Sequence, residues 1–149
     1  MMPVVAGAQT LEALLAAAAS RITRLEPREA FAAAADGALI VDIRSDDARL
    51  RDGIVPGSLR IPRTVLEWRV APDSASRSPH IGGLEQRLVL LCDHGYSTVL
   101  AAATLVDLGF VDAGDVIGGF AAWREAGLPV TEAPPPAPGL QGMAAPDHP

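Results

Sequence analysis

The sequence predicts a single α/β domain built around a mainly parallel sheet of about five strands, with helices covering both faces. Short continuous apolar runs, typical of strands buried on both faces, alternate along the chain with segments whose apolar residues recur at helical spacing. This alternation indicates strand–helix–strand units, in which successive strands run parallel. The 149 residues suffice for one domain with a substantial core but not for two.

The composition excludes several classes of protein. Hydrophobic residues make up 49% of the chain and aromatic ones only 4%, so many helical faces are expected to be lined by alanine. A net charge of -6 argues against a nucleic-acid partner, because no basic stripe is available to displace counterions from phosphates. No apolar segment approaches the ~18 residues of a membrane span. Cys92 is the only cysteine and the first 20 residues lack a charged leader, so we expect a cytoplasmic protein.

The N-terminal half is expected to hold three helices and three short strands. Thr10 is a suitable N-cap for the first helix, which forms an N-terminal extension over residues 1–21 with a frayed start. Pro27 opens the second helix, whose inward-facing residues are predicted to be Ala30, Phe31 and Ala34. The expected elements are helix 11–18, strand 22–25, helix 27–36, strand 38–43, helix 48–51 and strand 58–61.

The C-terminal half is expected to complete the sheet. Residues 71–83 are rich in Pro, Ser, Asp and Gly and predict an exposed loop. From Thr131 onward Pro, Ala and Gly dominate without periodicity, so 131–149 is predicted to be a disordered tail, which leaves 22–130 as the main domain. The remaining elements are helix 64–70, strand 88–92, helix 99–108, strand 115–117 and helix 120–126.

The lone cysteine occupies a special place in this arrangement. Cys92 ends a buried strand and precedes a helix, at the edge of the sheet where open α/β proteins bind ligands. Gly95 lets the backbone of the short loop approach an anion closely, and the N-terminal end of the following helix adds positive potential. Such a loop lowers the pKa of a thiol. The alternative is a structural cysteine, a residue type common in cores.

Four segments resemble motifs of the rhodanese-type sulfurtransferases. They are the loop Cys92-Asp93-His94-Gly95-Tyr96-Ser97-Thr98, the strand end Val41-Asp42-Ile43-Arg44, the turn Val55-Pro56-Gly57-Ser58 and the segment Gly118-Gly119-Phe120-Ala121-Ala122-Trp123. The resemblance covers residues 22–130 and implies the rhodanese-like three-layer fold.

The resemblance also implies a reaction. A Cys92 thiolate attacks the outer sulfur of a donor such as thiosulfate, carries it as a persulfide and gives it to cyanide, a thiol or a protein acceptor. Neither a metal nor a cofactor is implied, because backbone amides of the loop and the hydroxyls of Ser97 and Thr98 stabilise the anionic sulfur. The loop residues that the resemblance assigns to this cradle are Asp93, His94, Gly95, Tyr96, Ser97 and Thr98.

Two residues of the loop depart from the usual family pattern. Ser97 stands where many members place Arg, so one positive charge near the donor is missing, and Asp93 adds a negative charge beside the nucleophile. Candidates for binding the anionic substrate are Arg63 and Arg69, with Trp68 as a possible wall of the pocket. The alternatives are that both arginines are solvated surface charges and that Trp68 anchors the core.

The other motif residues are interpreted as structural. Asp42 and Arg44 are expected to hold the strand end by charged hydrogen bonds. Gly57, Gly118, Gly119 and Trp123 are expected to serve in turns and packing. His94 is interpreted as a loop residue and not as a base, since this chemistry needs none, and the histidines are too dispersed for a metal site.

Two further classes of function compete with the sulfurtransferase. A tyrosine phosphatase, a cell-cycle phosphatase of related fold or an arsenate reductase needs Arg six positions after the cysteine to grip phosphate, whereas position 98 is Thr. A non-enzymatic persulfide carrier, or a binding module that keeps the fold, stays open. A sulfur adduct that cyanide discharges would favour the enzyme over the carrier.

Overall fold

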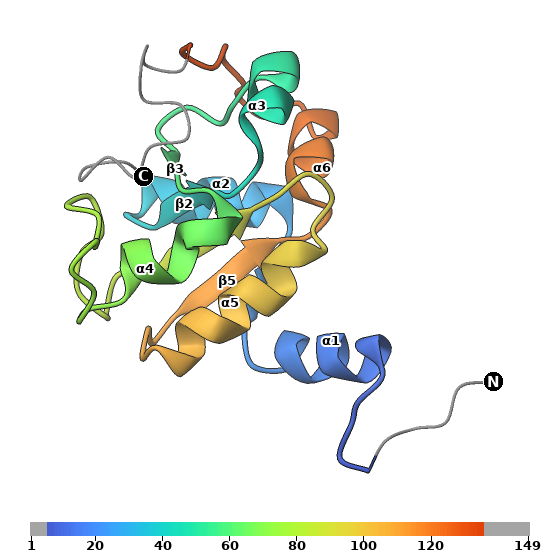
Figure 1. Ribbon diagram of the computed structural model, residues 1–149. Coiled ribbons are helices and arrows are strands. Elements are labelled where there is room, and N and C mark those ends of the chain that lie inside the picture. Colours follow the sequence, from blue (N-terminus) through green and yellow to red (C-terminus); the bar gives the residue numbers. More distant parts are fainter. Residues whose placement is uncertain (1–5, 136–149) are drawn as a thin grey trace.

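The computed structural model describes residues 6–135, which fold around one five-stranded sheet (Figure 1). The strands lie in the order β1-β5-β4-β2-β3, and every neighbouring pair is parallel. This confirms the predicted α/β class. The strands are β1 (Thr23–Leu25), β2 (Leu39–Asp42), β3 (Leu59–Arg60), β4 (Leu88–Leu91) and β5 (Ala113–Val116).

Helices cover both faces of the sheet and create two cores (Figure 1). In β4, Leu88 and Leu90 pack with α4 and α5 on one face, while Val89 and Leu91 pack with α2 and α6 on the other. Successive side chains of a strand point to opposite faces, so the continuous apolar run supplies both cores. The helices are α1 (Leu11–Ala19), α2 (Pro27–Ala35), α3 (Asp46–Asp52), the 3-10 turn η1 (Arg63–Val65), α4 (Leu66–Val70), α5 (Ser97–Asp107) and α6 (Gly119–Glu125).

Helix α1 lies outside the three layers, against the outer side of α5. Its predicted cap is present, because the Thr10 hydroxyl accepts a hydrogen bond from the Ala13 N–H at 3.0 Å. Ala18 packs between Val99 and Ala103 of α5 in a small third cluster. The alanine-rich face of α1 therefore buries little surface, as its sequence indicates.

The predicted inner face of α2 is partly wrong. Ala30 and Ala33 are buried, but Phe31 is 43% exposed. Residues three apart share one face of a helix, and Phe31 stands one position off the stripe that Ala30 and Ala33 form. Its ring instead meets the buried Trp123 edge-on, with centroids 5.9 Å apart.

The last strand starts two residues earlier than predicted, at Ala113. The additional residues include Gly114, and glycine is a residue type that is depleted in strands. Here it is required, because a Cβ on Gly114 would lie 1.8 Å from the carbonyl oxygen of Thr23 on β1. Glycine inside a strand marks such a close backbone approach.

The segment 71–83 has no helix or strand, as predicted, but it is not wholly exposed. Ser78 and Ile81 are buried, and the Ser78 N–H donates to the Arg69 carbonyl at 2.8 Å. The loop is thus folded back onto the end of α4, which the turn-rich composition does not reveal.

Order also extends beyond the predicted domain boundary at 130. Thr131 and Ile54 form an antiparallel bridge, with N–H to carbonyl distances of 2.9 and 2.8 Å in the two directions. The predicted tail at 136–149 and the first residues of the predicted frayed start, 1–5, lie outside the described residues. Among the described helices, none is long and apolar enough to cross a membrane.

Candidate active site

The lone thiol lies where β4 ends and α5 begins, as predicted. Cys92 directly follows Leu91, the last residue of β4, and is only 7% exposed. Its Sγ accepts a hydrogen bond from the Gly95 N–H at 3.1 Å. Gly95 has φ of +83°, a conformation that glycine adopts without strain. The loop therefore turns its own backbone donor onto the sulfur.

Opposing effects set the pKa of the Cys92 thiol. Burial raises the pKa, because the thiolate loses hydration. Hydrogen bonds from Thr98, from the Ser97 hydroxyl and from the Gly95 N–H lower it, and together they outweigh burial. The pKa of Cys92 consequently lies below the ordinary 9.0, the direction that favours a nucleophilic thiolate.

The start of α6 holds the first residues of the loop. The Phe120 N–H donates to the Cys92 carbonyl at 2.8 Å, and the Ala121 N–H donates to the Asp93 carbonyl at 3.1 Å. Gly119 makes this approach possible, since a Cβ there would lie 2.5 Å from the Cys92 carbonyl oxygen. A Cβ on Gly95 would likewise lie 2.7 Å from the Gly118 nitrogen. The glycine pair thus fits the predicted role in turns and packing.

Two charged residues that sequence reasoning missed stand behind the loop. Thr98 donates through Oγ1 to Asp115 Oδ2 at 2.7 Å, and the same Oγ1 is 3.5 Å from Cys92 Sγ. Arg24 donates to both oxygens of Asp115, from Nε at 2.9 Å and from Nη2 at 3.0 Å. Asp115 itself is fully buried. Its hydrogen bond and charge raise the pKa of Arg24, which favours the charged guanidinium.

A signal for this pair exists in the sequence, but only once the strands are paired. Arg24 and Asp115 are direct partners in the register between β1 and β5. They stand 91 positions apart in the chain, so no local motif contains both. A charged residue inside each of two predicted strands is the hint that the sequence alone offered.

Asp42 and Arg44 form the structural pair that the sequence predicts. Both are buried, and Arg44 donates to Asp42 from Nε at 3.0 Å and from Nη2 at 2.8 Å. Arg49 of α3 adds a third side-chain bond at 3.3 Å, and Arg44 also reaches the Gly53 carbonyl. The Arg44 guanidinium lies 3.9 Å over the ring centre of Phe120. The network connects β2, α3 and α6 beneath the loop.

The remaining motif residues also occupy structural positions. Gly57 has φ of +80° directly after Pro56, the conformation of a turn in which the Ser58 N–H returns to the Val55 carbonyl at 3.1 Å. Trp123 is buried, and its indole Nε1 donates to the Pro129 carbonyl at 2.9 Å. Both positions agree with the packing role expected for them.

Within residues 6–135, no described hydrogen bond or ion pair joins the predicted substrate-binding residues to Cys92. Arg63 pairs with Glu67 one helical turn away, at 3.0 Å. Arg69 is buried and donates to the Ser76 carbonyl at 2.7 Å, so it is neither a solvated charge nor an open binding group. Trp68 is 61% exposed, which excludes the alternative that it anchors the core. The binding role of Arg63 and Trp68 stays a prediction.

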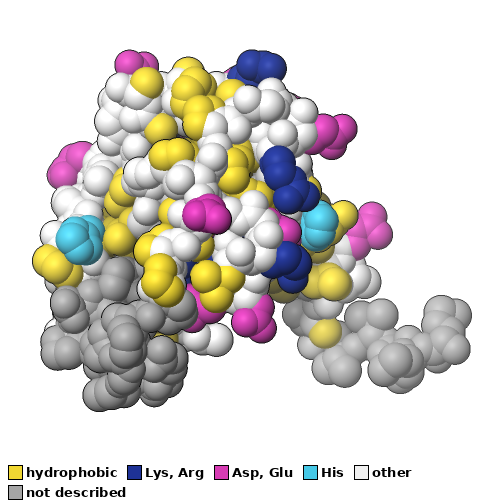
Figure 2. All heavy atoms as spheres, turned by 90° about the horizontal axis from the view of Figure 1, so that it is seen from above, with side chains coloured by type: hydrophobic (Ala, Val, Ile, Leu, Met, Phe, Trp, Pro, Cys, Tyr) yellow, Lys and Arg dark blue, Asp and Glu magenta, His cyan; other side chains and the backbone are white. Residues whose placement is uncertain are grey.

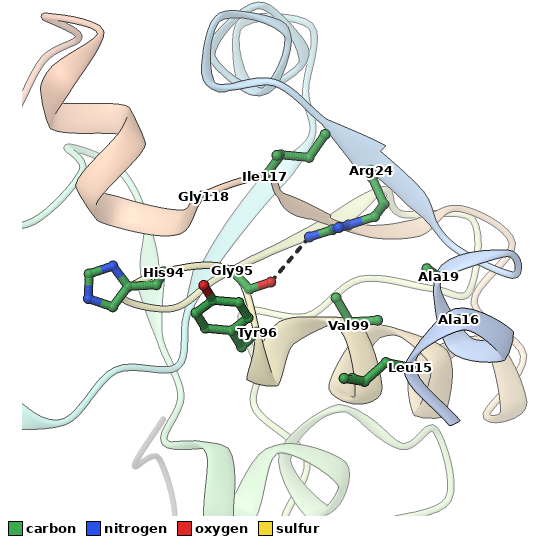
Figure 3. Close-up of a pocket in the computed structure, with 10 residues that line it drawn as sticks. All are labelled: Leu15, Ala16, Ala19, Arg24, His94, Gly95, Tyr96, Val99, Ile117 and Gly118. Carbon is green, nitrogen blue, oxygen red and sulfur yellow. Dashed lines mark hydrogen bonds between the residues drawn. The ribbon is translucent and has the colours of Figure 1, made fainter. Parts of the chain in front are cut away.

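A pocket of about 400 Å³ lies beside the loop, between α1 and α5 (Figure 3). His94, Gly95 and Tyr96 form one wall, and α1 supplies the opposite one. Figure 3 shows Arg24 reaching from β1 to the Gly95 carbonyl, at 3.2 Å. Tyr96 is 75% exposed and His94 is exposed, so both loop side chains face solvent and neither contacts Cys92 through a described hydrogen bond.

The face of the molecule that points upward in Figure 1 carries charges of both signs. Figure 2 shows arginine and carboxylate side chains interspersed with apolar ones, without a block of one sign. Within residues 6–135, no group of three or more His, Cys, Asp or Glu side chains is placed to hold a metal ion.

Comparison with known proteins identifies the family. The model of the rhodanese-like domain matches residues 26–126, which include the loop, the strand end at Asp42 and the Gly118-Gly119 pair. The chain belongs to the rhodanese-like family. Thiosulfate sulfurtransferase GlpE from Stutzerimonas stutzeri is 36% identical over 101 residues, covering 68% of this chain and 84% of that protein. Its counterpart from Pseudomonas savastanoi is 34% identical, with 68% and 86% covered.

Solved rhodanese-fold structures are also similar to this one. A protein from Rhodopseudomonas palustris, described as of unknown function and a possible tyrosine phosphatase, is 34% identical with a TM-score of 0.76, covering 88% of this chain and all of that one. The human single-domain sulfurtransferase is 26% identical with a TM-score of 0.57, covering 70% and 96%. The three-layer arrangement expected for the rhodanese fold is thus confirmed.

Proposed function

We propose that this protein is a rhodanese-type sulfurtransferase that moves a sulfane sulfur from a thiosulfate-like donor to a thiophilic acceptor through a persulfide on Cys92. The observation that carries the proposal is the buried lone thiol that accepts the Gly95 N–H within a loop between β4 and α5. Membership of the rhodanese-like family and relatives named thiosulfate sulfurtransferase support it.

The first half-reaction loads the enzyme. The Cys92 thiolate attacks the outer sulfur of thiosulfate, a new S–S bond forms, and the old S–S bond breaks with its electron pair leaving on sulfite. The product, Cys92–S–S⁻, keeps its negative charge on the outer sulfur. We expect the backbone N–H groups of the loop and the positive end of α5 to stabilise this charge.

The second half-reaction discharges it. Cyanide or a thiolate attacks the outer sulfur of the persulfide and takes it, and Cys92 is regenerated as a thiolate. A low pKa makes Cys92 a good leaving group, so the same hydrogen bonds serve both halves. A thiol that must return to the reduced state suits a reducing compartment, which is why we place the protein in the cytoplasm.

Intact-mass measurement tests the proposal directly. The reduced protein is incubated with thiosulfate, and one added sulfur is expected; added cyanide should remove it and yield thiocyanate. Cys92→Ser must abolish the adduct, because the chain has no other thiol. If the reduced wild-type protein takes up no sulfur, the proposal is wrong, whereas an adduct that cyanide leaves in place identifies a carrier.

The phosphatase alternative has one specific observation in its favour, the similar structure described as a possible tyrosine phosphatase. The loop argues against it. Position 98, where a phosphatase needs a guanidinium, is Thr, and its hydroxyl is already bound to Asp115. We therefore expect no hydrolysis of p-nitrophenyl phosphate above the Cys92→Ser background, and a Cys92-dependent rate would revive this alternative.

A further inference from the structure

The groups around the thiol form a closed ring of hydrogen bonds, and two of its five residues, Arg24 and Asp115, lie outside the four sequence motifs. Starting at Cys92 Sγ, the ring passes through Thr98 at 3.5 Å to Asp115 at 2.7 Å and on to Arg24 at 3.0 Å. Arg24 then donates to the Gly95 carbonyl at 3.2 Å, and the Gly95 N–H returns to Sγ at 3.1 Å. The ring joins β1, β5, α5 and the loop.

The hydroxyl of Thr98 has a single hydrogen, and two acceptors compete for it. The Asp115 carboxylate, which is paired with Arg24, can only accept, so at 2.7 Å it takes the hydrogen. What Thr98 Oγ1 then offers Cys92 is a lone pair, which accepts an S–H hydrogen but gives nothing to a thiolate. In this state the Gly95 and Thr98 N–H groups and the Ser97 hydroxyl are the remaining donors to the sulfur.

The two anionic forms of Cys92 carry their charge on different atoms. In the free thiolate the charge is on Sγ, next to Thr98. In the persulfide Sγ is neutral and the charge lies on the outer sulfur, one bond further out. If the Thr98 hydrogen is not donated to Sγ, the free thiolate loses a charge-assisted hydrogen bond, whereas the persulfide, whose Sγ is neutral, loses little.

We propose that Arg24 and Asp115 are positioning residues that hold the Thr98 hydroxyl away from Sγ and thereby favour sulfur-loaded Cys92 over the free thiolate. The inference rests on the proposed function for its sulfur-loading half. Arg24 orients the carboxylate and, through the Gly95 carbonyl, also fixes the turn that supplies the Gly95 N–H. Its residue number places it just before the region that the family model matches.

The charged groups on each neighbouring element define what else acts on the thiol. β5 contributes Asp115 and β1 contributes Arg24; the loop contributes Asp93 and the titratable His94. On β2 the buried Asp42 is neutralised by Arg44. α6 meets the loop through backbone N–H groups. Removing the charge of Asp115 therefore leaves the positive charge of Arg24 uncompensated, and this lowers the pKa of Cys92, as does a Thr98 hydroxyl that is free to donate to Sγ.

The first test is Asp115→Asn, with Asp112→Asn as its control. Asp112 also pairs with an arginine, Arg87, but it directly precedes the N-terminal end of β5, and no described contact joins it to Cys92 or Thr98. The pKa of Cys92 is measured from the pH dependence of iodoacetamide alkylation, and the loading constant from intact mass at fixed thiosulfate and sulfite concentrations. Asp115→Asn should lower the pKa of Cys92 by about 1 unit. At a pH above the Cys92 pKa of both the wild type and the variant, it should also lower the equilibrium constant for transfer of sulfur from thiosulfate to Cys92 about tenfold. Asp112→Asn should leave both as in the wild type.

Thr98→Val supplies a second test that does not disturb the ion pair. If the hydroxyl points to Asp115, its loss leaves the pKa of Cys92 unchanged or slightly lower, whereas a hydroxyl that donates to the thiolate would make the pKa rise by about 1 unit. The drop caused by Asp115→Asn should also shrink in the Thr98→Val background. A raised pKa in Thr98→Val, or an unchanged pKa in folded Asp115→Asn, overturns the inference.

The two proposals fail in different ways. A wild-type protein that thiosulfate cannot load overturns the proposed function and with it the preference for the loaded state, yet alkylation still decides whether Asp115 controls the thiolate. A wild-type protein that loads normally, with an Asp115→Asn variant of equal loading constant, keeps the function and overturns the positioning role. Far-UV circular dichroism of each variant shows that the fold is retained.

Discussion

At the scale of single residues, the reactivity of Cys92 depends on a contest between burial and hydrogen bonding. Burial opposes the thiolate, and the donors of the loop outweigh it, so the pKa of Cys92 lies below 9.0. The thiolate fraction grows as the pH rises through this pKa. Rates of alkylation and of sulfur uptake should therefore rise with pH and reach half of their plateau below pH 9.0. A midpoint at or above that of a short unfolded cysteine peptide would contradict this prediction.

Gly119 is the residue whose lack of a side chain matters most to the loop. Gly119→Ala must strain a φ of +64° and also push its Cβ against the Cys92 carbonyl oxygen at 2.5 Å. Since α6 has to move away from the loop, we expect a loss of more than 2 kcal/mol in the free energy of unfolding and at least tenfold in sulfur-transfer rate.

The matched control is Gly127→Ala. Gly127 has a similar φ of +74°, but a Cβ there meets nothing within 4 Å. Strain alone should cost about 1 kcal/mol in urea unfolding and leave the rate unchanged. If the two variants lose equal stability and equal activity, close packing of α6 on the loop is not what requires Gly119.

At the scale of elements, local patterns locate helices and strands well and their ends poorly. The start of α3 is one end that a local pattern explains, because the Ser45 side chain accepts the Ala48 N–H as an N-cap. With this cap α3 starts at Asp46, two residues before the predicted helix. The early start of β5 and the bridge at Thr131 cannot be predicted from the local sequence. Both depend on which backbone lies alongside, and neither neighbour is close in sequence.

The bridge between Ile54 and Thr131 gives a test at this scale. Thr131→Pro removes the N–H that donates to the Ile54 carbonyl at 2.9 Å. We expect the free energy of unfolding to fall by about 1 to 2 kcal/mol. Glu132→Pro, one residue further, is the control and should change it by less than about 0.5 kcal/mol. Equal effects of the two prolines would mean that the bridge does not contribute to stability.

At the scale of the whole molecule, buried charges hold the layers together at the end of the sheet where the thiol lies. Asp42 accepts from Arg44 and Arg49, and Arg44 in turn lies over Phe120 of α6. A buried pair of this kind costs desolvation when it forms, but removing one partner leaves the other charge without compensation. We therefore predict that the network is a structural requirement of the fold and not a source of catalysis.

Asp42→Ala tests this interpretation. The uncompensated Arg44 should lower the free energy of unfolding by about 3 to 5 kcal/mol in urea titrations. Asp107→Ala removes an exposed ion pair with Arg21 and should cost less than about 1 kcal/mol. An Asp42→Ala protein that keeps its stability but loses sulfur transfer would instead assign Asp42 a direct role in the reaction.

The sequence by itself determined the class of fold and the position of Cys92 between a strand and a helix. These follow from periodicity and from contacts between residues close in the chain. The prediction that Phe31 faces inward on α2 could be corrected only once its contact with Trp123, which is distant in the chain, was known. What local patterns cannot contain is the identity of a distant partner.

The tertiary structure alone decided which groups surround the sulfur. Arg63 and Arg69, which the family resemblance made candidates for binding the anionic substrate, are bound to Glu67 and to the Ser76 carbonyl. Arg24 and Asp115 stand behind the loop instead, because the pairing of β1 with β5 brings together two residues 91 positions apart. Strand register sets such contacts, and register depends on the packing of the whole sheet.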